Sequence, residues 1–307
     1  MKRVVVGLLV LAALGLAGFW IVTSPEAFAL VRGRIFTNLA AAPDLGKGKT
    51  LFWEGGCASC HAIPKQDDRT KLGGGLALKS PFGTFYAPNI SPHPRDGVGS
   101  WTVEQFARAM TQGVSPDGRH YYPAFPYTSY QRLSEADLRD LFGFLKTLVP
   151  VEGKVRDHDL PFPFNIRRTL GGWKWLFLDG RPFVASAQMS PAIARGAYLV
   201  EGPGHCAECH SPRNFLGGII AGMRFSGGPD PEGQGTVPNI TPDATGIKDY
   251  SKDDIIQILQ TGLKPDGDSV GGGMGAVVLN YAQAPKADVD VMAEYLKSLA
   301  PIKVEKK

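Results

Sequence analysis

The chain contains Cys57-Ala58-Ser59-Cys60-His61 and repeats the same pattern at Cys206-Ala207-Glu208-Cys209-His210. These two segments hold all four cysteines of the 307 residues. Cysteines three positions apart on a helical turn project to one side, so both sulfurs can form thioethers with the vinyl groups of one porphyrin. The following histidine then lies beneath the iron as an axial ligand. The pattern C-x-x-C-H is typical of covalent haem attachment, so the sequence predicts two haem c groups with iron ligands His61 and His210.

Three alternatives explain the cysteines less well. Disulfides are the default in an exported protein, but this spacing uses every cysteine in a haem motif and leaves none to pair. A thioredoxin-like redox pair needs no histidine after the second cysteine, and it would lie in a β-α-β setting that the sequence does not contain. A four-cysteine zinc site would leave both histidines without a role, and it would have to join motifs 149 positions apart.

The shift of 149 positions relates other segments as well, so the chain is an internal duplication. The same shift relates Gly113 to Gly262 and Pro116-Asp117-Gly118 to Pro265-Asp266-Gly267. A shift one position longer relates Pro88-Asn89-Ile90 to Pro238-Asn239-Ile240. Each half is therefore expected to form the same domain around its own haem.

Helical periodicity follows each motif after a long loop rich in glycine and proline. Apolar residues at helical spacing and polar N-caps predict a middle and a closing helix in each half: 102–112 and 134–148, then 251–261 and 287–299. With 38 glycines, much of the rest must be loop. The predicted fold is all-α and loop-rich, with two tandem class I cytochrome c domains. We place them at residues 43–150 and 191–303, joined by a linker at 151–190. That linker is rich in proline and aromatic residues, so we expect it to pack against a surface.

The N-terminus has the features of a membrane segment. After two basic residues, Val4 to Val22 are uncharged and mostly aliphatic, and as a helix they would be about 28 Å long, close to the thickness of the hydrocarbon core. Pro25 is expected to stop the helix. Ala27-Phe28-Ala29 also resembles a signal cleavage site, but a secretory apolar region is usually shorter. We therefore favour an uncleaved anchor at residues 1–25. The predicted location is the bacterial inner membrane, with the haem domains on the periplasmic side.

Three longer strings resemble a known family, the cytochrome c subunits of bacterial membrane-bound dehydrogenases for alcohols, aldehydes and sugar acids. The strings are Pro81-Phe82-Gly83-Thr84-Phe85-Tyr86-Ala87-Pro88-Asn89-Ile90, Pro116-Asp117-Gly118-Arg119-His120-Tyr121-Tyr122-Pro123-Ala124-Phe125-Pro126-Tyr127 and Leu160-Pro161-Phe162-Pro163-Phe164-Asn165-Ile166-Arg167. The resemblance implies that a partner dehydrogenase subunit donates electrons and that a quinone, another cytochrome or a terminal oxidase accepts them. Better-known members carry a third haem domain. This chain has two, so we expect direct transfer to a cytochrome or an oxidase to be more plausible than quinone reduction.

The sixth iron ligands differ between the halves. Met274 lies in the glycine-rich segment Gly271–Gly275, a predicted loop that would bring its thioether to the second haem. The position 149 residues earlier is Phe125, which cannot bind iron, although the resembling family often has methionine there. His120 in the same loop is our favoured sixth ligand of the first haem. Met110 and an open site are the alternatives.

Two other function classes remain open. A two-haem peroxidase or thiosulfate-oxidising cytochrome would use an open first haem for catalysis, and a sensor would bind a diatomic gas there. The family resemblance favours simple electron transfer, so we do not expect this chain to be an enzyme. A net charge of +4 without a basic stripe makes nucleic acid an unexpected partner.

Overall fold

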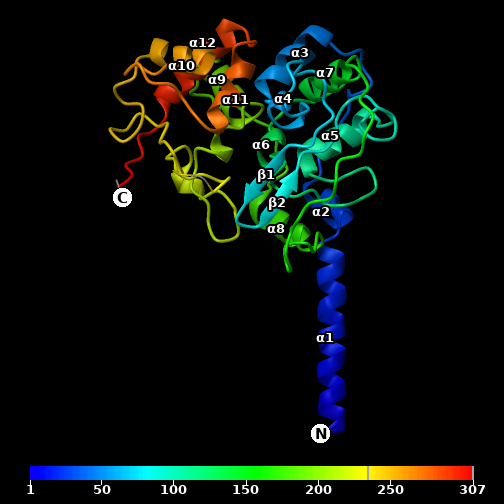
Figure 1. Ribbon diagram of the computed structural model, residues 1–307. Helices are drawn as coiled ribbons and strands as arrows, with labels where there is room; N and C mark the ends of the chain where they lie inside the picture. The colour runs from blue at the N-terminus through cyan, green and yellow to red at the C-terminus, as the bar shows by residue number, and fades with distance from the viewer. Residues whose placement is uncertain (234, 306–307) are drawn as a thin grey trace.

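The computed structural model describes residues 1–233 and 235–305. One long helix, α1 (Lys2–Val22), projects from a head that contains the rest of the chain (Figure 1). In the described part of the chain, α1 is the one helix long and apolar enough to cross a membrane, and its residues are not buried. Helices α2 (Pro25–Arg32) and α8 (Thr169–Phe177) lie at the end of the head from which α1 emerges. The predicted apolar segment is thus a continuous helix.

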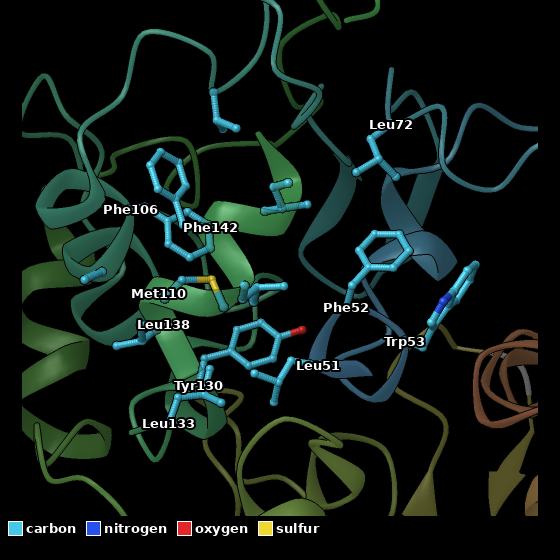
Figure 2. Packing of buried hydrophobic residues seen from close by; sticks show 14 of the residues in the cluster. Leu51, Phe52, Trp53, Leu72, Phe106, Met110, Tyr130, Leu133, Leu138 and Phe142 are labelled. Carbon is cyan, nitrogen blue, oxygen red and sulfur yellow. The ribbon is translucent and has the colours of Figure 1, made fainter. Parts of the chain in front are cut away.

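The first half of the head packs around one apolar core. Its elements are α3 (Leu45–Glu54), α4 (Cys57–His61), β1 (Ala77–Ser80), β2 (Gly83–Tyr86), α5 (Val103–Gln112), α6 (Tyr127–Tyr130) and α7 (Glu135–Leu145). Helix α7 packs against both α3 and α5. The core contains Phe52 of α3, Phe106 and Met110 of α5, and Leu138 and Phe142 of α7 (Figure 2).

The second half repeats this arrangement around a core of its own. Its elements are α9 (Pro191–Glu201), η1 (Cys206–Glu208), η2 (Ala221–Met223), β3 (Gly228–Pro229), β4 (Thr236–Val237), α10 (Lys252–Thr261), α11 (Gly273–Tyr281) and α12 (Lys286–Ser298). Helix α12 packs against α9 and α10 as α7 packs against α3 and α5. Each half therefore brings its opening, middle and closing helices together over one core.

The predicted all-α, loop-rich fold is confirmed, and its local signals explain the helix ends. Thr102 caps α5 and Ser251 caps α10, each in a capping box. Both helices end at a glycine in the left-handed region, Gly113 at φ 61° and Gly262 at φ 78°. Two short antiparallel hairpins, β1–β2 and β3–β4, are additions to the predicted helices. The domain boundaries stay predictions.

The linker packs against the head, and it also contains a helix that the sequence did not predict, α8. Side chains from this region bond to the last carbonyls of α1. Arg168 donates to the Trp20 carbonyl, and Trp175 Nε1 donates to Val22 O at 2.8 Å. From outside the linker, His120 Nε2 donates to the carbonyl of Thr23, the residue that follows α1, at 2.9 Å. The final carbonyls of a helix lack partners within it, so the head caps the end of α1.

Candidate functional site

The two attachment segments are single helical turns with slightly different geometry. Cys57 to His61 form the α-helical turn α4, whereas Cys206 to Glu208 form a 3₁₀ turn, η1. None of the four cysteines forms a disulfide. Burial raises the pKa of the Cys57 thiol to about 12 and that of Cys206 to about 12. Catalytic redox thiols have lowered pKa values, so these environments do not favour a thioredoxin-like pair.

The two histidines make matching hydrogen bonds. His61 Nδ1 lies 2.8 Å from the carbonyl oxygen of Pro88, and His210 Nδ1 lies 2.8 Å from that of Pro238. A carbonyl can only accept, so Nδ1 carries the proton and Nε2 keeps its lone pair for a metal. Burial lowers the pKa of both histidines, which favours the neutral ring that binds iron. The geometry fits an axial ligand in each half.

The repeated Pro-Asn-Ile segments thereby gain a role that the sequence did not reveal. In each segment the asparagine side chain accepts a hydrogen bond from the backbone N–H two residues on. Asn89 Nδ2 also donates to Val151 O at 2.8 Å, and Asn239 Nδ2 donates to Ile302 O at 2.8 Å. These bonds tie the turn to the chain just beyond the closing helix. They hold the proline carbonyl where the histidine needs it.

Met274 lies in the second half, in the first turn of α11 rather than in a loop. The helix is preceded by Gly272, whose φ of 57° is in the left-handed region. Met274 packs at the edge of the second core. A Cβ added at any of its glycine neighbours 271, 272, 273 and 275 would meet no atom within 4 Å. The backbone on both sides of Met274 is therefore uncrowded, and Met274 as the sixth ligand of the second haem stays a prediction.

His120 is not placed as its predicted role requires. Its ring is buried, with Nε2 bonded to Thr23 O and Nδ1 accepting from Lys174 Nζ at 3.0 Å. Lys174 is itself fully buried and also donates to Gly113 O at 2.7 Å. Burial and the lysine charge lower the pKa of His120 to about 4. A neutral imidazole with both nitrogens engaged has no lone pair for iron, so we withdraw His120 as the sixth ligand of the first haem.

The other candidates for that position remain. Phe125 packs among aromatic rings, 5.9 Å from Tyr121 and 5.6 Å from Tyr130 between centroids. Met110 is buried in the first core near Phe142 and Tyr130 (Figure 2). Met110 and an open site therefore stay predictions for the sixth position of the first haem.

Within residues 1–233 and 235–305, no three side chains of the His, Cys, Asp and Glu types gather where they could hold a metal ion directly. The cysteine pairs of the two halves therefore do not combine into one zinc site. Each pair stays with its own histidine, which is the donor set that covalent haem requires.

A buried carboxyl group lies between the halves. Glu54, at the end of α3, is 1% exposed, and neither of its carboxyl oxygens accepts a hydrogen bond from any residue in the described ranges. Burial raises the pKa of Glu54 to about 8, helped by the Asp288 carboxylate of α12 and opposed by Arg195 of α9. Glu54 is therefore mainly protonated at neutral pH.

Comparison with known proteins agrees with this geometry. Residues 45–149 match the cytochrome c family. The chain is 44% identical to a diheme cytochrome c-type protein of Cereibacter sphaeroides, over 98% of this chain and 99% of that protein.

Two further relatives are named as dehydrogenase subunits. The chain is 36% identical to the fructose dehydrogenase cytochrome subunit of Gluconobacter japonicus, over 87% of this chain and 54% of that protein. It is 37% identical to the alcohol dehydrogenase (quinone) cytochrome c subunit of Gluconacetobacter polyoxogenes, over 91% of this chain and 61% of that protein. The chain thus spans a little over half the length of these two relatives.

Proposed function

The chain belongs to the family of dihaem c-type cytochromes that includes the cytochrome subunits of dehydrogenases. From this premise we propose that it is a membrane-anchored carrier of electrons from a partner dehydrogenase to the respiratory chain. The observation that carries the proposal is the repeated site. Each half presents two cysteines and a histidine on one turn, and each histidine is oriented by a proline carbonyl.

We assign the haem-binding residues by half. Cys57, Cys60 and His61 would hold the first haem, and Cys206, Cys209, His210 and Met274 would hold the second. Haem iron supplies a one-electron couple. In each half the two cysteines would hold the porphyrin through thioethers, and the histidine, oriented through Nδ1 by a proline carbonyl, would be an axial ligand. The relatives are named as cytochrome subunits of dehydrogenases, which supports a role as an electron carrier rather than as an enzyme.

We also propose that α1 stays attached as the anchor. Cleavage after Ala29 would remove Phe28, which is 1% exposed and packs with Tyr127 and Leu178 of the head. It would also remove Thr23, whose carbonyl is the partner of His120. Burying a phenylalanine contributes about 2 kcal/mol. The residues around the possible cleavage site are thus part of the folded head, which supports an uncleaved helix.

The donor and acceptor follow from the relatives' names and from the orientation of α1. The relatives are subunits of dehydrogenases for alcohols, fructose and gluconate, so a catalytic dehydrogenase subunit is the proposed donor. The proposed acceptor is another cytochrome, a terminal oxidase or a quinone. Lys2 and Arg3 at the start of α1 favour a cytoplasmic N-terminus, so we propose that the haem-bearing head lies in the periplasm.

The test is to isolate the protein from native membranes in mild detergent. A larger dehydrogenase subunit is expected to co-purify, and its substrate is expected to reduce both haems, as followed by their visible absorption. The intact mass of the cytochrome is expected to include residues 1–29.

A chain starting at Leu30 behind a foreign cleavable signal is the matched control. It is expected to be released without detergent and to unfold at lower denaturant concentration, because it lacks Phe28 and Thr23. Turnover of peroxide or thiosulfate by the purified cytochrome alone, with no reduction by a co-purifying dehydrogenase, would contradict the proposal and support an enzyme.

A further inference from the structure

The two haem-attachment segments meet at the contact between the halves. Asn280 Nδ2 of α11 donates to Ser59 Oγ of α4 at 2.6 Å. Tyr281 Oη of α11 donates to the carbonyl of Glu54 at 3.3 Å. Helix α11 thus contacts both α3 and α4. The second half is held directly against the residues that flank the first haem-attachment turn.

His205 has a strained backbone at this contact. It immediately precedes Cys206, and its φ of 41° lies in the left-handed region. Residues other than glycine are uncommon in that region, although histidine is among the more frequent of them, and holding one there costs roughly 1 kcal/mol. The equivalent residue of the first half is Gly56, at φ 64°. Glycine would meet the same backbone requirement without strain, so the imidazole at position 205 requires another explanation.

The His205 ring reaches across to the first attachment segment. A Cβ built on Gly56 would lie 3.3 Å from His205 Nε2. The ring also packs edge-on against Tyr130, with centroids 5.6 Å apart, and Tyr130 Oη donates to the carbonyl of Gly55 at 2.8 Å. Gly56 leaves room for the imidazole because it lacks a side chain. His205 therefore bridges the backbones next to Cys57 and Cys206.

We propose that His205 is a positioning residue that couples the two attachment segments and sets the rate of electron exchange between the haems. The inference rests on the proposed function, because it requires a haem on each segment. In the exchange, one ferrous iron is oxidised to ferric and the other iron is reduced by the same electron, with no bond made or broken. Gly56 directly precedes Cys57, and His205 directly precedes Cys206. The contact between Gly56 and His205 is therefore a short connection between the two haems that these cysteines would hold.

The test injects one electron into the oxidised two-haem protein by pulse radiolysis and follows its redistribution between the haems. His205→Gly and His205→Asn both suit the left-handed backbone, because glycine and asparagine adopt it readily. Each is expected to slow interhaem exchange on the order of tenfold, since small displacements of reacting groups have large effects on rate. Haem content and both reduction potentials are expected to be unchanged.

His93→Ala is the matched control, since His93 pairs with Asp96 in a loop of the first half, and it is expected to keep the original rate. Unaltered exchange in His205→Gly would overturn the inference, and so would slow exchange accompanied by loss of haem or by shifted potentials. No exchange between haems in the natural protein would instead overturn the proposed two-haem carrier.

Discussion

Met274→His is expected to lower one of the two reduction potentials and leave the other unchanged. A thioether ligand raises the potential of haem iron relative to a second imidazole. Axial ligands span roughly 0.8 V across haem proteins, so we expect a decrease on the order of a few tenths of a volt. Spectroelectrochemical titration measures both potentials. The weak far-red band of sulfur ligation in the oxidised protein should disappear at the same time.

Met223→His is the matched control, since Met223 of η2 is the other methionine near a glycine-rich loop of the second half. It is expected to change neither potential. If Met223→His lowers a potential while Met274→His does not, the sixth ligand is Met223 and the assignment of Met274 is wrong.

Glu54→Gln is expected to remove a large pH dependence of stability. The pKa of Glu54 is raised from 4.5 to about 8 in the folded protein, first by burial and then by Asp288. A raised pKa favours folding while the group is protonated, so this contribution is fully present below about pH 4.5 and is lost as the pH rises toward 8. Over that range the natural protein should lose at most about 1.4 kcal/mol of unfolding free energy per pH unit relative to the variant.

Guanidinium unfolding of both proteins at several pH values checks this expectation. The charged groups facing Glu54 are Asp288 of α12, Asp137 of α7 and Arg195 of α9. Glu54→Gln leaves all three in place, so the difference between the two pH profiles reports the carboxyl group of Glu54. Glu152→Gln alters a largely exposed carboxyl group and should preserve the natural pH profile. Parallel profiles for Glu54→Gln and the natural protein would show that Glu54 is ionised when buried.

Local sequence signals predicted the parts of the fold that local chemistry determines. The caps at Thr102 and Ser251 set the starts of α5 and α10, and the apolar stripe set the position of α7. The repeat correctly singled out the Pro-Asn-Ile segments. Their bond to the histidine joins positions 27 and 28 residues apart, so their role became visible only in three dimensions.

The sequence was less informative where distant contacts decide the structure. His120 has partners 97 and 54 residues away, at Thr23 and Lys174, and no local pattern indicates that they use both ring nitrogens. Helix α8 forms in a segment with two glycines, Gly171 and Gly172, which local propensity disfavours in helices. Its contacts with α2 and the end of α1 stabilise it instead. Met274 was expected in a loop because glycines surround it and glycine has a low helix propensity, but it lies in the first turn of α11.

The haem content of the purified chain tests the central claim most directly. Intact mass under denaturing conditions, together with staining of the gel band for haem, counts the covalently attached groups. The natural protein is expected to carry two haems, and Cys57→Ala combined with Cys60→Ala is expected to carry one, still attached at Cys206 and Cys209. A single haem in the natural protein, or two haems after the double substitution, would contradict the account.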